Sequence, residues 1–248
     1  MKSISVKTRL IIFLGLFAVY LAVKEKDAIF LISVAIAAIS AIAADSFIIY
    51  LKEKRLLLIE SSIISGLIIG FVLSSKQPFW IVALASFLAI GSKHLIRVNK
   101  KHLFNPAAFG IFLATILFGA TTQWKGTYLW YIIAPFGFYF IIKIRKIELL
   151  LGYGLAALGL FSIQAIFQKV PVSNIFGYLS YFFIFVMLIE PKTTPIKLSA
   201  KYMFGIGVAV LIFIMTEIGV KFDAEVCALL IANLFVPLLD KIPERRPI

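Results

Sequence analysis

AIFLISVAIAAISAIAADSFIIYLKEKR (residues 28–55) is a long apolar run that ends in a short cluster of cations. An α-helix needs about 20 mostly apolar residues to cross the hydrocarbon core of a bilayer, and this run supplies them. The same alternation continues along the chain, where clusters of lysine and arginine separate ten apolar stretches. Because these runs lack the polar–apolar alternation of barrel strands, the pattern predicts an all-α integral membrane protein with ten transmembrane helices.

The predicted helices differ in length. Several are shorter than a full membrane span, so they must be re-entrant or be completed by loop residues that are buried in protein. The predicted ranges are 10–23, 28–51, 56–75, 78–92, 103–120, 127–142, 147–167, 175–189, 202–220 and 224–239.

The distribution of cations predicts the orientation in the membrane. Of the 25 lysine and arginine residues, nineteen fall in the odd-numbered clusters and six in the even-numbered ones. Short cytoplasmic loops collect lysine and arginine, so both termini are expected in the cytoplasm and the protein in the cytoplasmic membrane. Nucleic-acid binding is disfavoured because the cations are scattered over loops and form no continuous surface.

Composition agrees with this class of protein. The chain is 62% hydrophobic, with a mean hydropathy of +1.03, and residues 1–248 are expected to form a single membrane domain. Leu10–Val23 follows a basic start but precedes no small-residue cleavage site, so we interpret it as a first helix rather than a signal peptide. The single Cys227 excludes an internal disulfide and cannot by itself hold an iron–sulfur cluster or zinc.

Ten helices with both ends on one side divide into five plus five, which is the arithmetic of an inverted repeat. The expected halves are residues 1–123 and 124–248. FVLSSKQP (71–78) and VMLIEPKTTP (186–195) support this division, since both are apolar runs that end in small polar residues, a lysine and a proline. Loops between helices often have such a composition for reasons unrelated to symmetry.

Charged residues within the spans have two interpretations. Asp45 and Glu60 lie one to two turns from the cytoplasmic ends of their predicted helices. They could take up a cation or a proton, or they could form interfacial ion pairs with nearby cations, namely Lys52, Lys54, Arg55 or Lys93. The second interpretation is favoured for both, and Glu217 is also expected at the interface.

Three polar motifs interrupt the spans. Asn105–Pro106 opens the fifth predicted helix, whose N-terminus could face an anionic or carbonyl-bearing ligand, although an ordinary helix cap would also explain the dipeptide. EPKTTP (190–195) holds two prolines, an acid and two hydroxyls and cannot be a helix interior. Asn233 lies in the middle of the last span and needs hydrogen-bonding partners there.

The two histidines, His94 and His102, flank one cytoplasmic loop. Haem binding in a membrane bundle requires histidines on facing helices, and these two are poorly placed for it. We therefore interpret them as interfacial cations.

Three stretches together resemble a known family. They are residues 65–110, which include HLFNPAAFG, residues 183–195 (FIFVMLIEPKTTP) and residues 228–247 (ALLIANLFVPLLDKIPERRP). Their order and spacing are similar to those of two related membrane subunits. These are NqrB, from the sodium-pumping NADH:quinone reductase, and RnfD, from the Rnf complex. The resemblance implies two inverted five-helix halves in a urea-transporter-like fold, and electron transport through flavin coupled to the movement of Na⁺ or H⁺.

Family members carry FMN covalently on a threonine on the outer side, and the Nqr subunit is also associated with riboflavin. Here GATT (119–122) places Thr121 on the outer side, in a segment much shorter than is usual for the family. Phe118 stands where the family usually has a small hydroxyl residue, and Thr115 stands where it has an acid. We therefore expect no covalent flavin at Thr121, and instead FMN or riboflavin that is bound non-covalently or supplied by a partner.

The resemblance favours a membrane subunit of a flavin-dependent electron-transport complex, with other membrane or peripheral subunits as partners. An alternative is a permease or channel for a small solute or a flavin precursor, and a further one is a purely structural subunit. The candidate binding residues under the first hypothesis are Asn105 with Pro106, Glu190, Thr193, Thr194 and Asn233.

Overall fold

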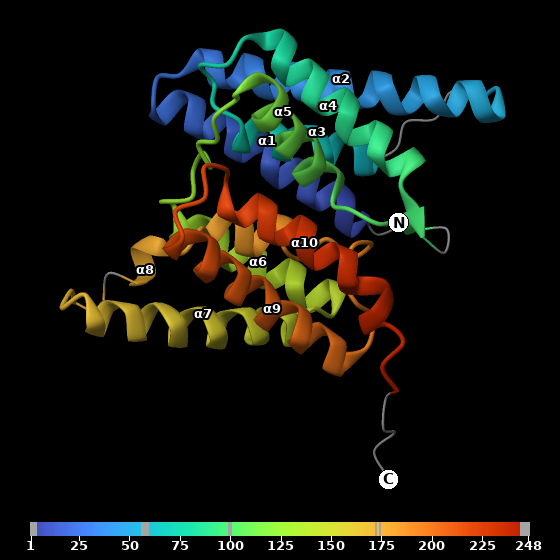
Figure 1. Ribbon diagram of the computed structural model, residues 1–248. Coiled ribbons are helices and arrows are strands. Elements are labelled where there is room, and N and C mark those ends of the chain that lie inside the picture. Colours follow the sequence, from blue (N-terminus) through green and yellow to red (C-terminus); the bar gives the residue numbers. More distant parts are fainter. Residues whose placement is uncertain (1–3, 56–59, 99–100, 172, 174, 244–248) are drawn as a thin grey trace. The chain divides into compact units, whose positions relative to one another are not determined.

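The computed structural model describes residues 4–55, 60–98, 101–171, 173 and 175–243 (Figure 1). Four helices in this part of the chain are long and apolar enough to cross a membrane, namely α1 (Val6–Lys24), α2 (Ala28–Glu53), α7 (Ile147–Phe167) and α9 (Leu198–Glu217). Five shorter apolar helices accompany them: α3 (Glu60–Val72), α4 (Phe79–Leu95), α5 (Pro106–Phe118), α6 (Trp130–Ile144) and α10 (Ala224–Leu239). The chain is therefore an all-α, multi-pass membrane protein.

The surfaces of the long helices suit a lipid environment. Leu16 and Val23 on α1 are 68% and 73% exposed, and Leu155 on α7 is 70% exposed. Large apolar side chains in such positions are unfavourable in water and favourable against lipid tails. The apolar character all around these helices follows from their having to face both lipid and protein.

Most predicted spans correspond to helices, but the eighth does not form one continuous helix. In the predicted range 175–189, a short helix α8 (Ile175–Tyr178) ends before Leu179, and the π-helical turn η2 (Phe183–Met187) follows. The Leu188 N–H donates to the Phe183 carbonyl at 2.9 Å, five residues back. The first residues of the third predicted span, 56–59, and the end of the third motif, 244–247, lie outside the described residues.

The chain divides into two compact units. Unit 1 comprises residues 1–97 and 106–126, and contains α1 to α5. Within it, α2 packs on α3 and α4, α5 packs on α4 and α3, and α1 packs on α3. In Figure 1 these helices are coloured from blue to green.

The end of α3 is completed by an extended segment from elsewhere in unit 1. The backbone N–H groups of Gln123 and Lys125 donate to the carbonyls of Val72 and Phe71, at 2.7 and 2.8 Å. The Ser74 N–H donates to the Thr121 carbonyl at 2.9 Å. A helix end leaves carbonyl groups without intrahelical partners, and the 121–125 segment supplies donors for them.

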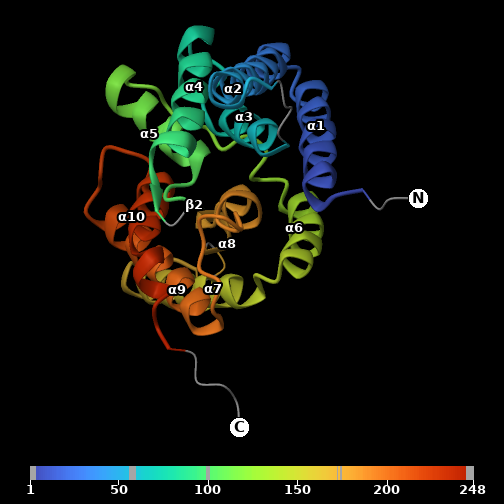
Figure 2. The ribbon, with the colours of Figure 1, turned by 90° about the vertical axis from the view of Figure 1, so that its right-hand side faces the viewer.

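Unit 2 comprises residues 98–105 and 127–248, and contains α6 to α10. Helices α7 and α9 pack closely and α10 packs on α9 (Figure 2). Helix α6 packs on η2. The close approach of α7 and α9 depends on two glycines. A Cβ atom on Gly205 would lie 2.3 Å from the Leu149 carbonyl oxygen, and one on Gly152 would lie 2.5 Å from that of Tyr202.

A short β-hairpin lies where the chain passes between the units. It consists of β1 (Arg97–Val98) and β2 (Lys101–His102). Asn105 and Pro106 follow directly, and Pro106 is the first residue of α5. Helix α5 therefore begins three residues later than the sequence predicted, because residues 101–102 form β2 and Pro106 takes the first helical position.

Candidate functional site

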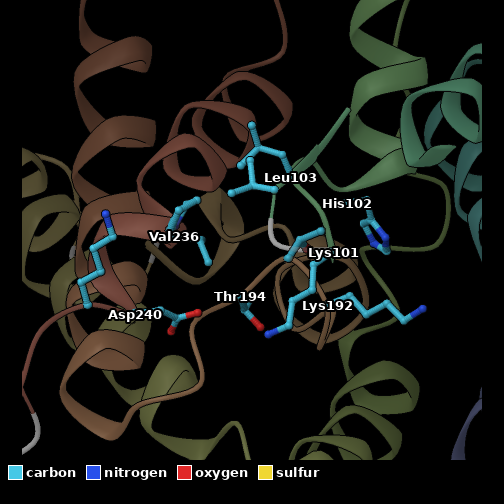
Figure 3. A pocket seen from close by; sticks show the side chains of 11 residues that line it. Lys101, His102, Leu103, Lys192, Thr194, Val236 and Asp240 are labelled. Atoms are coloured by element: carbon cyan, nitrogen blue, oxygen red, sulfur yellow. The ribbon is translucent and has the colours of Figure 1, made fainter. Parts of the chain in front are cut away.

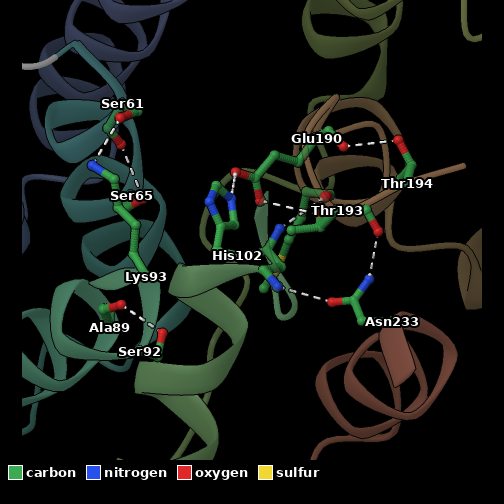
Figure 4. A network of polar contacts seen from close by, with 12 residues as sticks. Ser61, Ser65, Ala89, Ser92, Lys93, His102, Glu190, Thr193, Thr194 and Asn233 are labelled. Atoms are coloured by element: carbon green, nitrogen blue, oxygen red, sulfur yellow. Dashed lines mark hydrogen bonds and ion pairs between the residues drawn. The ribbon is translucent and has the colours of Figure 1, made fainter. Parts of the chain in front are cut away.

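The loop that follows η2 is closed by its own side chains. The Thr194 hydroxyl donates to the Glu190 carbonyl at 2.9 Å, and the Thr193 hydroxyl donates to the Glu190 carboxylate at 3.4 Å (Figure 4). Both threonines are buried, and the prolines at 191 and 195 prevent helix continuation. The loop is thus a compact turn with a half-buried carboxylate at its start.

Asn233 of α10 joins this loop to the residue before α5. Its Oδ1 accepts from the Asn105 backbone N–H at 2.8 Å, and its Nδ2 donates to the Thr193 carbonyl at 2.9 Å. Asn105 in turn donates from its side-chain Nδ2 to the Met187 carbonyl at 3.2 Å. Both amides are at most 1% exposed, so one buried network unites Asn105, Glu190, Thr193, Thr194 and Asn233 (Figure 4).

His102 extends this network. Its Nε2 lies 3.4 Å from Glu190 Oε1, and its side chain is 5% exposed. The interpretation of His102 as an interfacial cation is therefore wrong, since the ring is buried against an acid. The sequence signal that could have indicated this is the short spacing from His102 to the Asn105–Pro106 motif.

A pocket of about 200 Å³ opens beside the loop (Figure 3). Its wall combines cations with polar and apolar groups, including Lys101, His102, Lys192, Thr194, Asp240 and Lys241. Asp240, directly after α10, holds the C-terminal end of the loop, because its carboxylate accepts a hydrogen bond from the Ile196 N–H at 2.9 Å. In Figure 3 Lys101 extends toward Thr194, whereas Lys192 points away from it.

Lys146 holds the end of the 190–195 loop, and the sequence analysis did not identify it as a site residue. It lies between α6 and α7, is 5% exposed, and donates from Nζ to the Pro195 carbonyl at 2.6 Å. Burial, followed by repulsion from the nearby Lys201 ammonium, lowers the pKa of Lys146 to about 8. Its charge is therefore sensitive to conditions near neutral pH, although in sequence it resembles any other topology-setting loop cation.

Two other candidate residues belong to unit 1. Pro106 belongs to unit 1 as the first residue of α5. Thr121 is an exposed residue of unit 1, and its hydroxyl accepts from Gln77 Nε2 at 3.1 Å. Both remain candidates from sequence alone.

The intramembrane acids also differ from one another. Glu60 accepts hydrogen bonds from the hydroxyls of Ser5, at 2.9 Å, and Thr8. Glu217, at the end of α9, accepts from Gln164. Glu217 lies at the end of its helix, as expected, whereas Asp45 of α2 is 1% exposed and pairs with Lys93. Lys93 is one of the four cations predicted as possible partners, and it does pair with Asp45. Both side chains of this pair are buried.

The fold and the site define a multi-pass membrane protein in which the interrupted span of α8 and η2 is followed by a loop with a buried polar network. The chain matches the sequence model of the NQR2, RnfD, RnfE family over residues 2–132 and 127–248. It belongs to that family, and is thus a membrane subunit of the kind found in Rnf- and Nqr-type complexes. Direct sequence comparison with curated proteins finds no match.

The flavin that the family implies does not fit the pocket of unit 2 as a whole molecule. The pocket volume of about 200 Å³ is below the roughly 300–1,000 Å³ of sites that enclose drug-sized ligands. Its wall contains no Phe, Tyr or Trp on which a flavin ring could stack, and the amides of Asn105 and Asn233 already have partners. Among the described residues, no group of three His, Cys, Asp or Glu is placed to hold a metal ion.

Proposed function

We propose that the chain is an electron-transport subunit of an Rnf/Nqr-like complex in the cytoplasmic membrane, coupled within that complex to the movement of Na⁺ or H⁺. The observation that carries this proposal is the buried network of unit 2. It ties together the LFNPA, EPKTTP and Asn233 motifs, which lie far apart in the chain and together carry the family resemblance. The network gives the loop a fixed shape at one end of the unit.

The distribution of charge supports placing that end in the cytoplasm. Among the described residues of unit 2, the connections at this end and the adjoining helix ends carry eight cations, whereas Lys169 and Lys221 lie at the other end. Cytoplasmic loops collect lysine and arginine, which favours cytoplasmic N- and C-termini. The eight are Lys101, Lys143, Arg145, Lys146, Lys192, Lys197, Lys201 and Lys241.

We also propose that the units are inverted repeats of the urea-transporter-like kind. The packing inside each unit supports this proposal. In unit 1, α2 packs on α4, α4 on α5, and α1 on α3; in unit 2, α7 packs on α9, α9 on α10, and α6 on η2. Both α3 and η2 end in a polar loop with a proline, at 74–78 and 190–195.

The flavin in this proposal comes from a partner protein. A pocket too small for a whole flavin favours this arrangement over a flavin held by unit 2 alone. The lysines around the pocket, such as Lys101 and Lys241, could dock an acidic surface of a partner, since complementary charge speeds and orients association. Thr121 is expected to carry no covalent flavin.

The first test is the visible spectrum of the complex isolated through a tag on this chain, before and after acid precipitation. We expect a flavin band in the complex that acid releases, and no flavin fluorescence on the gel band of this chain. A complex without any flavin would contradict the electron-transport proposal. Fluorescence that remains on this chain, and that disappears in Thr121→Val, would show covalent attachment instead.

A second test concerns Glu190. Glu190→Gln keeps the size of the side chain but removes the charge that accepts from Thr193 and faces His102. Hydrogen bonds to charged groups contribute about 1.5–3 kcal/mol, so electron transfer per complex should fall about tenfold or more. The measurement is the donor-dependent reduction rate in membrane vesicles, normalised to the amount of folded chain.

The matched control for this test is Glu217→Gln, an equal loss of charge outside the network. We expect its rate to stay within about twofold of the unsubstituted protein, as for surface substitutions. Equal rates in the Glu190 and Glu217 variants would remove Glu190 from the functional site.

A permease for a small solute or a flavin precursor is the alternative function. The 119–126 segment favours this alternative, because it is much shorter than the flavin-carrying segment of the family and its backbone instead caps α3. Uptake into liposomes that contain only this chain distinguishes the two, because an electron-transport subunit without partners should show no uptake above that of empty liposomes.

A further inference from the structure

A second polar cluster lies inside unit 1. It joins Asp45 of α2, Ser61 and Ser62 of α3, and Lys93 and His94 of α4. The Lys93 ammonium lies 2.7 Å from Asp45 Oδ2 and donates to the Ser61 hydroxyl at 3.0 Å, as Figure 4 shows for Lys93 and Ser61. The other carboxylate oxygen, Oδ1, contacts His94 Nε2.

The burial of these groups is unusual for a simple structural contact. The side chains of Asp45, Lys93 and His94 are 1%, 6% and 9% exposed. Taking charges out of water is costly, and a buried ion pair is often no more stabilising than apolar residues of the same size. Ionisable residues inside membrane segments are rare and usually serve a functional role.

The hydrogen bonds determine which atom can exchange a proton. Asp45 accepts from both Lys93 and the Ser62 hydroxyl, so the contact with Lys93 is an ion pair between an ammonium and a carboxylate. An ionised carboxylate only accepts hydrogen bonds, so the hydrogen between Asp45 and His94 belongs to Nε2 of the imidazole. The second ring nitrogen, Nδ1, is then the atom of His94 that can bind or release a proton.

The remaining charges around His94 are few. The charged groups that act on the ring are Asp45 and Lys52 of α2 and Lys93 of α4. From α3, Ser61 and Ser62 contribute hydroxyls and Glu60 bonds to Ser5 and Thr8, and α5 carries no titratable side chain along Pro106–Phe118. The imidazole therefore has one carboxylate next to it, and that carboxylate is held in place by the Lys93 ammonium.

We propose that this cluster is a proton-binding site, in which His94 takes up and releases one proton at Nδ1 beside a fixed Asp45–Lys93 ion pair. Water at the adjacent membrane face supplies and receives the proton, since His94 is one residue from the end of α4. Uptake changes the charge of the cluster from zero to plus one, and no other bond is made or broken. The site stands independently of the electron-transport proposal, because its residues lie in unit 1.

The test is histidine NMR of the full chain in lipid nanodiscs, with ¹⁵N-labelled imidazoles. The chain has only two histidines, so His94→Asn assigns the signals. We expect His94 to be an Nε2–H tautomer at high pH and to become doubly protonated reversibly between about pH 5 and 8, the range in which histidine changes charge. An imidazole that keeps one protonation state throughout would overturn the proposal, and this result needs no variant that alters the ion pair.

Asp45→Asn and Glu60→Gln provide a matched pair. Both remove one negative charge, but Glu60 bonds to Ser5 and Thr8 of the α1 region and not to the cluster. Asp45→Asn should lower the pH of His94 protonation by about one unit or more, the effect of losing an adjacent opposite charge. Glu60→Gln should leave it unchanged, and equal shifts in the two variants would show that Asp45 is not the acid that controls the site.

Discussion

Replacing Gly205 with alanine is expected to destabilise unit 2 by about 3 kcal/mol, the upper part of the range for overpacked interiors. The new Cβ atom would lie 2.3 Å from the Leu149 carbonyl oxygen and 2.7 Å from the Tyr153 nitrogen. Because both are backbone atoms, no side chain can rotate away, and α7 and α9 must separate. The measurement is thermal unfolding of the purified protein in detergent.

Gly207 provides the control for this substitution. It lies on the same helix, and a Cβ atom there would meet nothing within 4 Å. Gly207→Ala should therefore be neutral or stabilise the helix by about 0.5–1 kcal/mol. If the two variants unfold at the same temperature, the close packing of α7 on α9 is incorrect.

Asn233→Leu is the other substitution with a large expected effect. Leucine has a similar size but leaves the Asn105 N–H and the Thr193 carbonyl buried without their present partner. An unsatisfied buried group costs about 1–3 kcal/mol, so the total for the two groups should be about 2–6 kcal/mol. We also expect faster hydrogen exchange across residues 190–197, measured by mass spectrometry, because the loop loses its connection to α10.

Leu234→Ala is the control, since Leu234 is the next residue of α10 and is 50% exposed. This substitution should change the free energy of unfolding by no more than about 0.5 kcal/mol and should leave hydrogen exchange across residues 190–197 unchanged. Unchanged loop exchange in Asn233→Leu would mean that the loop holds its shape without the amide.

The sequence predicted the long helices well because each is an uninterrupted apolar run with charged ends. It failed in the eighth span for a physical reason. The run 175–189 is apolar throughout, and hydropathy does not distinguish a continuous helix from one that breaks near Ser180 and continues as a π-helical turn. The inverted arrangement of the two units stays a prediction.

For the candidate site, the sequence identified residues whose polarity was out of place. Asn105, Glu190 and Asn233 interrupt apolar spans, and the structure brings them into one network. His102 and Lys146 were missed because cations near helix ends are expected for topological reasons alone, and only the fold shows that both are buried. Whether the network binds a ligand stays a prediction.

The cap on α3 has a consequence for how the protein is made. The carbonyls of Phe71 and Val72 accept from Lys125 and Gln123, which the ribosome adds some fifty residues later. Backbone groups without partners are costly in a bilayer, so these carbonyls need other partners, such as water, until that segment has been made. We therefore expect the end of α3 to become fully hydrogen-bonded only after residues 121–125 have been made.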